Sequence, residues 1–206
     1  NPLKDDSGAD ITTKTDADGN YLFNRLPLGS YKVEVVPGEV KVDGTDAKLS
    51  DYKQTYGYGS STDRTQVGQG KLVTPSAIEL TAAAPNVTKV DFGFVKPASV
   101  GDYVWFDANK DGLQDSDEPA LPGITATIVD ASGNPVTDAS GNPVAAVTTD
   151  VAGKYKFENL LPGDYKVIFT NPEGYEATVS QAGDDRGADS NGTESVVSLA
   201  QGQEDK

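Results

Sequence analysis

The sequence contains two copies of one strand-and-turn pattern. Residues 15–36 read TDADGNYLFNRLPLGSYKVEVV, and residues 149–170 read TDVAGKYKFENLLPGDYKVIFT. Ten positions are identical at a constant spacing of 134 residues, without a gap. A regular internal repeat indicates two related units, each built on the same local plan, rather than one continuous core.

Within the copies, apolar side chains alternate with polar ones. Tyr165, Val167 and Phe169 follow this period of two, and so do two further sets, Val90/Phe92/Phe94 and Ile124/Ala126/Ile128. The period is that of a strand with one buried face. Turn residues such as Pro162-Gly163 separate these runs. We therefore expect an all-β fold, a sandwich or partly open barrel, with almost no helix.

The phase of the repeat sets the expected domain boundaries. We assign residues 1–95 to a first domain, residues 96–99 to a short linker and residues 100–206 to a second domain. Copy one has no counterpart of residues 101–133, and copy two has none of residues 89–95, which read KVDFGFV. The first domain is therefore expected to be incomplete at its N-terminus and the second at its C-terminus. Either the chain is a fragment, or a neighbouring molecule supplies the strands by complementation.

Composition excludes several classes of function. The net charge of −15 would repel the phosphates of nucleic acids and of anionic membranes. Cysteine and histidine are absent, which excludes a thiolate nucleophile, a Ser-His triad and an ordinary zinc site. No apolar run is long enough for a transmembrane helix, so we expect no membrane insertion. Paired-carboxylate hydrolysis is the remaining enzymatic alternative, but the acids at meaningful spacing are better explained as metal ligands.

One loop concentrates negative charge. Residues 107–119 read DANKDGLQDSDEP and fit the calcium-loop pattern D-x-[DN]-x-[DN]-G-x₅-E without a mismatch. Gly112 occupies position six, where the loop needs a sharp turn. The oxygen ligands that the spacing predicts are the side chains of Asp107, Asn109, Asp111, Asp115 and Glu118 and the carbonyl of Leu113. Hard oxygen ligands in this number favour Ca²⁺ over Mg²⁺.

The flanks of this loop differ from those of a helix–loop–helix sensor. A strand-like run, VGDYVWF, precedes it, and Pro119 and Pro122 prevent an ordinary exiting helix. We therefore expect an unpaired structural site; the alternative is a solvated acidic turn. A second cluster, GDDRGADSNG, places Asp184, Asp185 and Asp189 close together and is a weaker calcium candidate, with a plain polar turn as its alternative.

The combination VGDYVWFDANKDGLQDSDEPALPGITATIVDASGN, followed by TTDVAGKYKFENLLPGDYKVIF, resembles the B-type repeat of serine–aspartate-repeat surface adhesins, the SdrD B-like domains. That family is similar to the collagen-adhesin B-type (Cna B) and transthyretin-like folds. The resemblance covers nearly all of residues 100–206 and, more distantly, residues 1–95. It implies two tandem Ig-like or transthyretin-like β-sandwiches, more than one calcium ion per repeat, and a secreted bacterial protein anchored to the cell wall through regions outside this chain.

The leading functional prediction is a calcium-stabilised spacer that holds a functional head away from a bacterial surface, with adjacent repeats of the same polypeptide and calcium ions as partners. One alternative is an adhesive module that binds a host protein or glycan through Tyr52, Tyr56 and Tyr58. Another is a strand-complemented subunit of an extracellular filament. Some relatives of the resembled family carry a Lys–Asn or Lys–Asp isopeptide bond, for which Asp91 is a candidate.

Overall fold

The computed structural model describes residues 3–4, 6–36, 38–42, 44–54, 66–68, 71–73, 77–87, 90, 92–180, 182 and 188–205, and leaves the side chains of 66–68 and 71–73 undescribed. These residues form β-strands and one short 3-10 turn, η1 (Leu49–Asp51), which confirms the predicted all-β class. No helix among them is long and apolar enough to span a bilayer. The chain divides into two compact units: unit 1 is Asn1–Val35 with Ser61–Asp91, and unit 2 is Val36–Ser60 with Phe92–Lys206. The domain boundaries drawn from the sequence stay a prediction.

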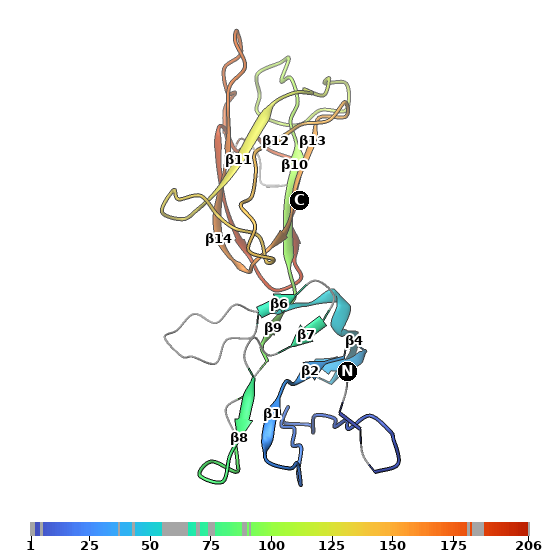
Figure 1. The fold of residues 1–206 in the computed structure, drawn as a ribbon. Helices are drawn as coiled ribbons and strands as arrows, with labels where there is room; N and C mark the ends of the chain where they lie inside the picture. The colour runs from blue at the N-terminus through green and yellow to red at the C-terminus, as the bar shows by residue number, and fades with distance from the viewer. Residues whose placement is uncertain are drawn as a thin grey trace. The chain divides into compact units, whose positions relative to one another are not determined.

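Unit 2 contains a two-sheet sandwich (Figure 1). One sheet has the order β13–β10–β16 and consists of β10 (Ala98–Tyr103), β13 (Lys154–Leu160) and β16 (Glu204–Asp205). The other has the order β12–β11–β14–β15 and consists of β11 (Thr125–Asp130), β12 (Val147–Thr148), β14 (Gly163–Phe169) and β15 (Glu194–Leu199). In these two sheets β16 runs parallel to β10, and the other pairings are antiparallel.

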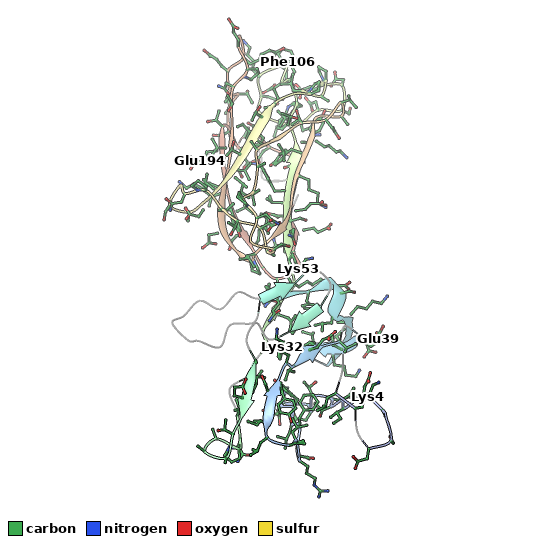
Figure 2. All side chains as sticks on the ribbon, in the orientation of Figure 1. Lys4, Lys32, Glu39, Lys53, Phe106 and Glu194 are labelled. Atoms are coloured by element: carbon green, nitrogen blue, oxygen red, sulfur yellow. The ribbon has the colours of Figure 1, made fainter. Side chains whose placement is uncertain are left out.

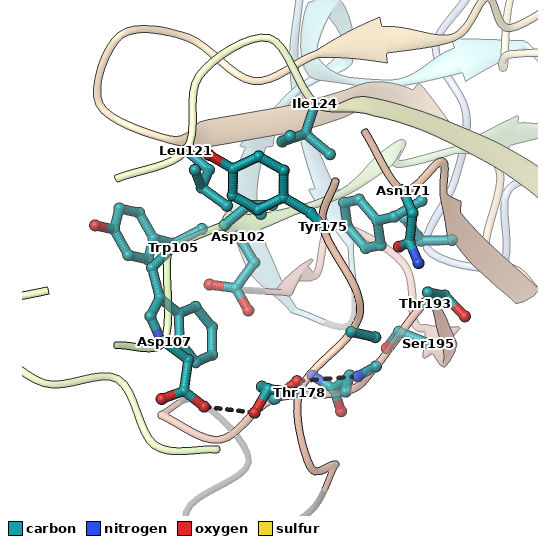
Figure 3. Close-up of a pocket in the computed structure, with 18 of the residues that line it drawn as sticks. Asp102, Trp105, Asp107, Leu121, Ile124, Asn171, Tyr175, Thr178, Thr193 and Ser195 are labelled. Atoms are coloured by element: carbon teal, nitrogen blue, oxygen red, sulfur yellow. Dashed lines mark hydrogen bonds between the residues drawn. The ribbon is translucent and has the colours of Figure 1, made fainter. Parts of the chain in front are cut away.

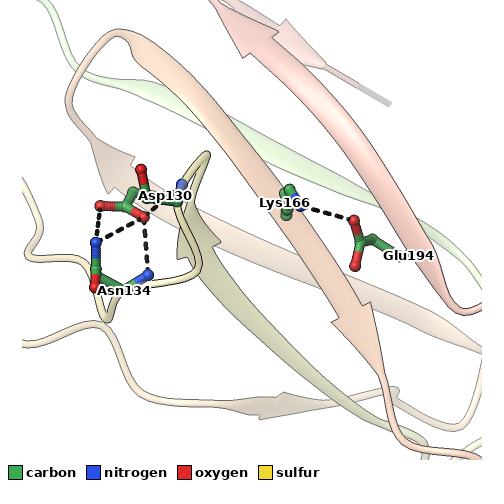
Figure 4. A network of polar contacts seen from close by, with 5 residues as sticks. Asp130, Asn134, Lys166 and Glu194 are labelled. Atoms are coloured by element: carbon green, nitrogen blue, oxygen red, sulfur yellow. Dashed lines mark hydrogen bonds and ion pairs between the residues drawn. The ribbon is translucent and has the colours of Figure 1, made fainter.

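The core of unit 2 lies between these sheets. The three-stranded sheet contributes Ala98, Val100, Phe157 and Leu160, and the four-stranded sheet contributes Ala126, Ile128, Tyr165, Val167, Val197 and Leu199. The predicted alternation thus places Tyr165 and Val167 on the buried face of β14, while Lys166 forms an ion pair with Glu194 of β15 at 3.1 Å on the other face (Figure 4). Apolar burial between two amphipathic sheets is the main source of stability for such a unit.

Aspartate-anchored turns connect the strands. In the turn after β11, Asp130 Oδ1 accepts hydrogen bonds from the amides of Ser132 and Asn134 at 2.9 and 2.8 Å (Figure 4). Hydrogen bonds from Asn134, led by its side-chain amide, lower the pKa of Asp130. The same amides, two and four residues downstream, bond to the aspartates at 16, 138 and 150. Asp-x-x-Gly sequences adopt this turn because the carboxylate satisfies amides that the turn leaves free.

The remaining strands are short. In unit 1, β1 (Gly29–Tyr31) pairs with β8 (Ile78–Leu80), and a second sheet has the order β2–β7–β6, with β2 (Glu34–Val35), β7 (Lys71–Val73) and β6 (Gln66–Gly68). In unit 2, β3 (Glu39–Val42) pairs with β4 (Thr45–Lys48), and β5 (Lys53–Gln54) pairs with β9 (Phe94–Val95). Of the predicted alternating run at 90–94, the described strand covers only Phe94 onward.

The two sequence copies share structural details. The hydroxyl of Tyr31 donates to the carbonyl of Pro27 at 2.5 Å, and Tyr165, its partner in copy two, donates to Leu161 at 2.6 Å. Gly29 pairs with Leu80 as Gly163 pairs with Leu199. A residue with positive φ occurs at the same place in each copy, Arg25 at 60° and Asn159 at 59°. These agreements show that the repeat in the sequence is also a repeat of local structure.

Candidate metal centre

The acidic loop closes at the end of β10. The Phe106 amide donates to the Pro119 carbonyl at 2.9 Å, and Trp105 forms a bridge with Ala120, so the chain enters and leaves the loop side by side. Phe106 marks the place of the loop in Figure 2. Residues 119–180, all of which the structure describes, contain no helix after Glu118. The loop is therefore held by strand-like flanks, as the prolines predict.

Asp107, at the first position, organises the start of the loop. Its Oδ1 accepts from the Lys110 amide at 2.6 Å, and its Oδ2 accepts from the Gly112 amide at 2.9 Å and from the Thr178 hydroxyl at 2.6 Å (Figure 3). Burial opposes ionisation of Asp107, but the bonds from Thr178 and from loop amides outweigh it and lower its pKa. The carboxylate is thus held charged at neutral pH.

The amide of Asn109 connects two other predicted ligands. Its Nδ2 donates to Asp111 Oδ2 at 2.9 Å and to Asp115 Oδ2 at 3.0 Å, while its Oδ1 accepts from the Asp111 amide at 3.0 Å. Asp111 Oδ1 accepts from the Leu113 amide at 2.8 Å. The carboxylates of Asp111 and Asp115 thus share one neutral amide group as their hydrogen-bond donor. This amide satisfies one oxygen of each carboxylate but neutralises none of their negative charge.

Glu118, at the twelfth position, ties the two ends of the loop together. Its Oε1 accepts from the Ala108 amide at 2.8 Å, and its Oε2 accepts from the Asp115 amide at 3.2 Å. Both carboxylate oxygens of Glu118 therefore point toward backbone amides of the loop.

The two candidate clusters meet at Leu113. Leu113 and Asp189 form an antiparallel bridge, flanked by bonds from the Gln114 amide to the Ala188 carbonyl at 2.9 Å and from the Ser190 amide to the Gly112 carbonyl at 2.8 Å. Because neighbouring residues make those bonds, the Leu113 carbonyl is turned away from the 188–190 segment. Asp184 and Asp185 of the second cluster lie outside the described residues.

Asp189 is a buried carboxylate without a partner. The residue is 4% exposed, and neither Oδ1 nor Oδ2 has a hydrogen-bond partner among the described residues. An unpaired buried charge costs several kcal/mol. This orphaned group, beside a loop whose described acids form no ion pair with a described lysine or arginine, fits a bound cation.

The described residues contain no group of three or more acidic side chains already arranged around a metal position. The physical reason is visible in the hydrogen bonds above, because the loop amides and Asn109 take up the carboxylate oxygens. The ligand set drawn from the sequence therefore stays a prediction.

The structure adds two contacts that the sequence did not suggest. Thr178 bonds to Asp107 across 71 residues of sequence, and a Cβ at Gly112 would stand 2.4 Å from the Val179 carbonyl. Residues 178–179 thus cover the loop, and no periodicity or motif in that segment announces the contact.

The other sequence candidates are only partly described. Tyr52 is half-buried next to η1, and Tyr56, Tyr58 and Asp91 lie outside the described residues. The adhesive surface and the isopeptide bond remain untested predictions.

Comparison with known proteins agrees with the resemblance found in the sequence. Residues 98–206 match the family model of the SdrD B-like domain. The chain is 34% identical over 201 residues to serine-aspartate repeat-containing protein F of Staphylococcus epidermidis, covering 96% of this chain and 11% of that protein. It is 38% identical over 179 residues to serine-aspartate repeat-containing protein D of Staphylococcus aureus strain Newman, covering 86% of this chain and 12% of that protein.

The chain thus spans about a tenth of the length of these relatives. Solved structures are more distant. The minor pilin GBS52 of Streptococcus agalactiae aligns with a TM-score of 0.35 at 14% identity, over 66% of this chain and 61% of that chain. A likeness at this level carries no functional argument.

Proposed function

Because this chain belongs to the SdrD B-like domain family, we propose that it is a calcium-stabilised spacer repeat of a bacterial surface adhesin. The family is one of adhesin repeats without enzymatic activity, as the sequence predicts. The spacer role, the calcium ion and wall anchoring are parts of the proposal.

The observation that carries the proposal is the unpartnered Asp189 beside the calcium-pattern loop. A folded unit with a buried, unpaired carboxylate and five acids in residues 107–118 gains stability from any cation that binds there. The hard oxygen donors and the close turn at Gly112 favour calcium.

The residues proposed to hold the ion are those of the loop pattern. The side chains of Asp107, Asn109, Asp111, Asp115 and Glu118 and the carbonyl of Leu113 supply the oxygens, while Asp189 adds negative charge from the adjoining segment. Bound calcium would offset two of these five negative charges. Thr178 and the Gly112 amide orient Asp107, and the Ala108 and Asp115 amides orient Glu118.

The test is calorimetric titration of the calcium-depleted chain with calcium. We expect saturable binding that weakens by at least about tenfold in Asp107→Asn and in Glu118→Gln, because each variant removes a charged ligand. Asp117→Asn is the matched control: Asp117 is an exposed acid of the same loop, at position eleven, which the pattern does not use. Its calcium affinity should stay within about threefold of the native value, because only a screened charge is lost.

Asp189→Asn gives a second, independent readout. Without calcium the variant should be more stable than the native chain, because an unpaired buried charge is removed. With saturating calcium the order should reverse or the difference should vanish. Equal calcium affinity for the native chain, Asp107→Asn and Glu118→Gln would show that the loop is an ordinary acidic turn.

The proposed role also predicts that the ion protects the loop from local opening. Limited proteolysis should cut within residues 107–118 in the presence of a chelator and should be suppressed by calcium, because local opening exposes the loop to protease. Cleavage at the same rate in both conditions would contradict the role.

A further inference from the structure

Asn191 is the one asparagine in the sequence that precedes a glycine. The peptide nitrogen after an asparagine can attack the side-chain carbonyl carbon, and glycine favours this attack because it has no Cβ to obstruct the approach. The asparagines at 1, 134, 142 and 171 precede proline, whose nitrogen carries no proton to lose. The others precede tyrosine, arginine, valine, lysine or leucine. The sequence therefore singles out Asn191-Gly192 as a chemically labile pair.

The structure leaves both partners of this reaction lightly held. Asn191 is half-buried, and its side chain makes no hydrogen bond to a described residue. The Gly192 amide donates to the Ser190 hydroxyl at 3.2 Å, the long end of the range for such bonds. Among the described residues, a Cβ built on Gly192 would meet only the Ser180 Cβ, at 3.7 Å. The attacking nitrogen thus gives up one weak bond and has room to move.

Asparagines elsewhere in unit 2 have their side-chain amides tied to aspartates. Nδ2 of Asn109 donates to two carboxylates at 2.9 and 3.0 Å. Nδ2 of Asn134 donates to Asp130 at 3.0 Å, and Nδ2 of Asn159 donates to Asp138 at 2.9 Å. Loss of any of these amides as ammonia would break bonds to charged acceptors, which are stronger than neutral ones. Asn191 has no such restraint from the described residues.

We propose that Asn191 is a site of spontaneous covalent modification, in which its side-chain amide is lost to attack by the Gly192 nitrogen. That nitrogen gives up its proton and bonds to Cγ of Asn191, while the Cγ–Nδ2 bond breaks and ammonia leaves with the proton. Water then opens the cyclic succinimide. Cleavage of the new Cγ–N bond gives aspartate, and cleavage of the original peptide bond gives isoaspartate, with the backbone running through Cγ. No oxidant or metal takes part.

Both products change the segment that meets the acidic loop. Each adds one negative charge two residues from Asp189, the buried carboxylate without a described partner. A further unpaired charge there raises the repulsion that the chain already carries without a cation.

Isoaspartate also lengthens the backbone between two anchored groups. The Ser190 amide donates to the Gly112 carbonyl at 2.8 Å, and the Thr193 carbonyl accepts from the Phe169 amide at 2.9 Å. Only residues 191 and 192 separate these anchors, so an inserted methylene displaces at least one of them.

The test is peptide mapping of the full chain after incubation at neutral pH and physiological temperature in excess chelator, so that it does not depend on the proposed calcium ion. Trypsin cuts after Arg186, and peptide 187–206 contains Asn191 as its one asparagine. We expect this peptide to gain about 1 Da and to become a substrate for an isoaspartate methyltransferase. Its rate in the folded chain should lie within about tenfold of the rate in the free synthetic peptide, because the fold restrains the pair little.

Asn109 is the internal control, because the tryptic peptide that ends at Lys110 contains no other asparagine. Its side-chain bonds and the following lysine should make it react at least about tenfold more slowly than Asn191. Asn191→Gln is the matched variant and should show no mass gain in peptide 187–206, because the longer side chain cyclises poorly.

Hydrogen exchange at the Ser190 amide separates the two products. It should speed up by at least about tenfold in the isoaspartate form isolated from the aged sample, because the bond to Gly112 is disturbed. Asn191→Asp carries the added charge on a normal backbone, and its exchange should stay within about threefold of the native value. A folded chain that reacts more than about tenfold slower than the peptide, an equal mass gain in Asn191→Gln, or unchanged Ser190 exchange in the isoaspartate form would overturn the proposal.

Discussion

Gly112→Ala tests whether the segment that covers the acidic loop is packed as the structure has it. Gly112 has φ of 78° and is buried, and a Cβ built there would lie 2.4 Å from the Val179 carbonyl oxygen and 3.0 Å from the Ala182 Cβ. Gly123 is the matched control, because it has the same φ of 78° but nothing within 4 Å of an added Cβ.

Two contributions to the loss of stability in Gly112→Ala can be separated, one from backbone conformation and one from steric displacement. Placing alanine in the left-handed region costs about 1–2 kcal/mol at either position. At Gly112 the added methyl also needs about 1 Å more room, because unbonded carbon and oxygen atoms approach only to about 3.5 Å. Since the obstacle is backbone, the displacement adds about 1–3 kcal/mol, as in other overpacked sites. We expect Gly112→Ala to cost about 2–5 kcal/mol and Gly123→Ala about 1–2 kcal/mol.

Urea unfolding in the presence of a chelator is the assay, because it removes any contribution from bound calcium. The variants should differ in midpoint with unchanged slope. Equal losses of stability for Gly112→Ala and Gly123→Ala would refute the packing of residues 178–179 on the loop.

Three further predictions concern hydrogen bonds and charge. The buried Thr149 hydroxyl accepts a hydrogen bond from the Ile124 amide at 2.9 Å and donates one to the Leu121 carbonyl at 2.6 Å. Thr149→Val should therefore lower the free energy of unfolding in urea by about 1–3 kcal/mol. Thr148→Val, at the exposed neighbouring residue, is the control and should change it by less than about 0.5 kcal/mol. Tyr165 has a buried ring, and its hydroxyl donates to the Leu161 carbonyl, so Tyr165→Phe should lower the free energy of unfolding by about 0.5–1.5 kcal/mol. Tyr31→Phe, at the more exposed equivalent in copy one, should lower it less. Equal losses would contradict the view that burial makes the Tyr165 hydrogen bond the stronger of the two. Asp102 has a pKa raised above its ordinary value of 3.8, mainly by burial, so ionisation of this residue destabilises the fold progressively as pH rises from 3.8, and the loss is complete above the raised pKa. Asp102→Asn should therefore be more stable than the native chain at pH 7, and the difference should shrink toward zero below about pH 4; a constant difference from pH 3 to 7 would contradict this reading.

Local features of the structure followed from local sequence. The alternation at Tyr165, Val167 and Phe169 predicted β14, and the aspartates that the two copies share at positions 16 and 150 anchor matching turns in the structure. The prolines after Glu118 predicted the absence of an exiting helix. These predictions succeed because strand period and turn chemistry depend on a few neighbouring residues.

Contacts between distant segments did not follow from the sequence. Nothing near Thr178 indicates that it bonds to Asp107, and the pairing of Asp189 with Leu113 depends on how two loops are brought together by the sandwich. Sequence periodicity defines which face of a strand is buried, whereas the tertiary arrangement defines what lies against it.

The most direct test of a calcium-stabilised fold is thermal unfolding of the full chain in about 1 mM calcium, in excess chelator, and in about 1 mM magnesium. A site with a dissociation constant of about 10 μM would be worth about 2.7 kcal/mol in that calcium, which corresponds to a rise in Tm of about 5–10 °C for a chain of this size. Magnesium should give a much smaller rise, because it demands a tighter octahedral site. The same Tm in all three solutions would contradict the account.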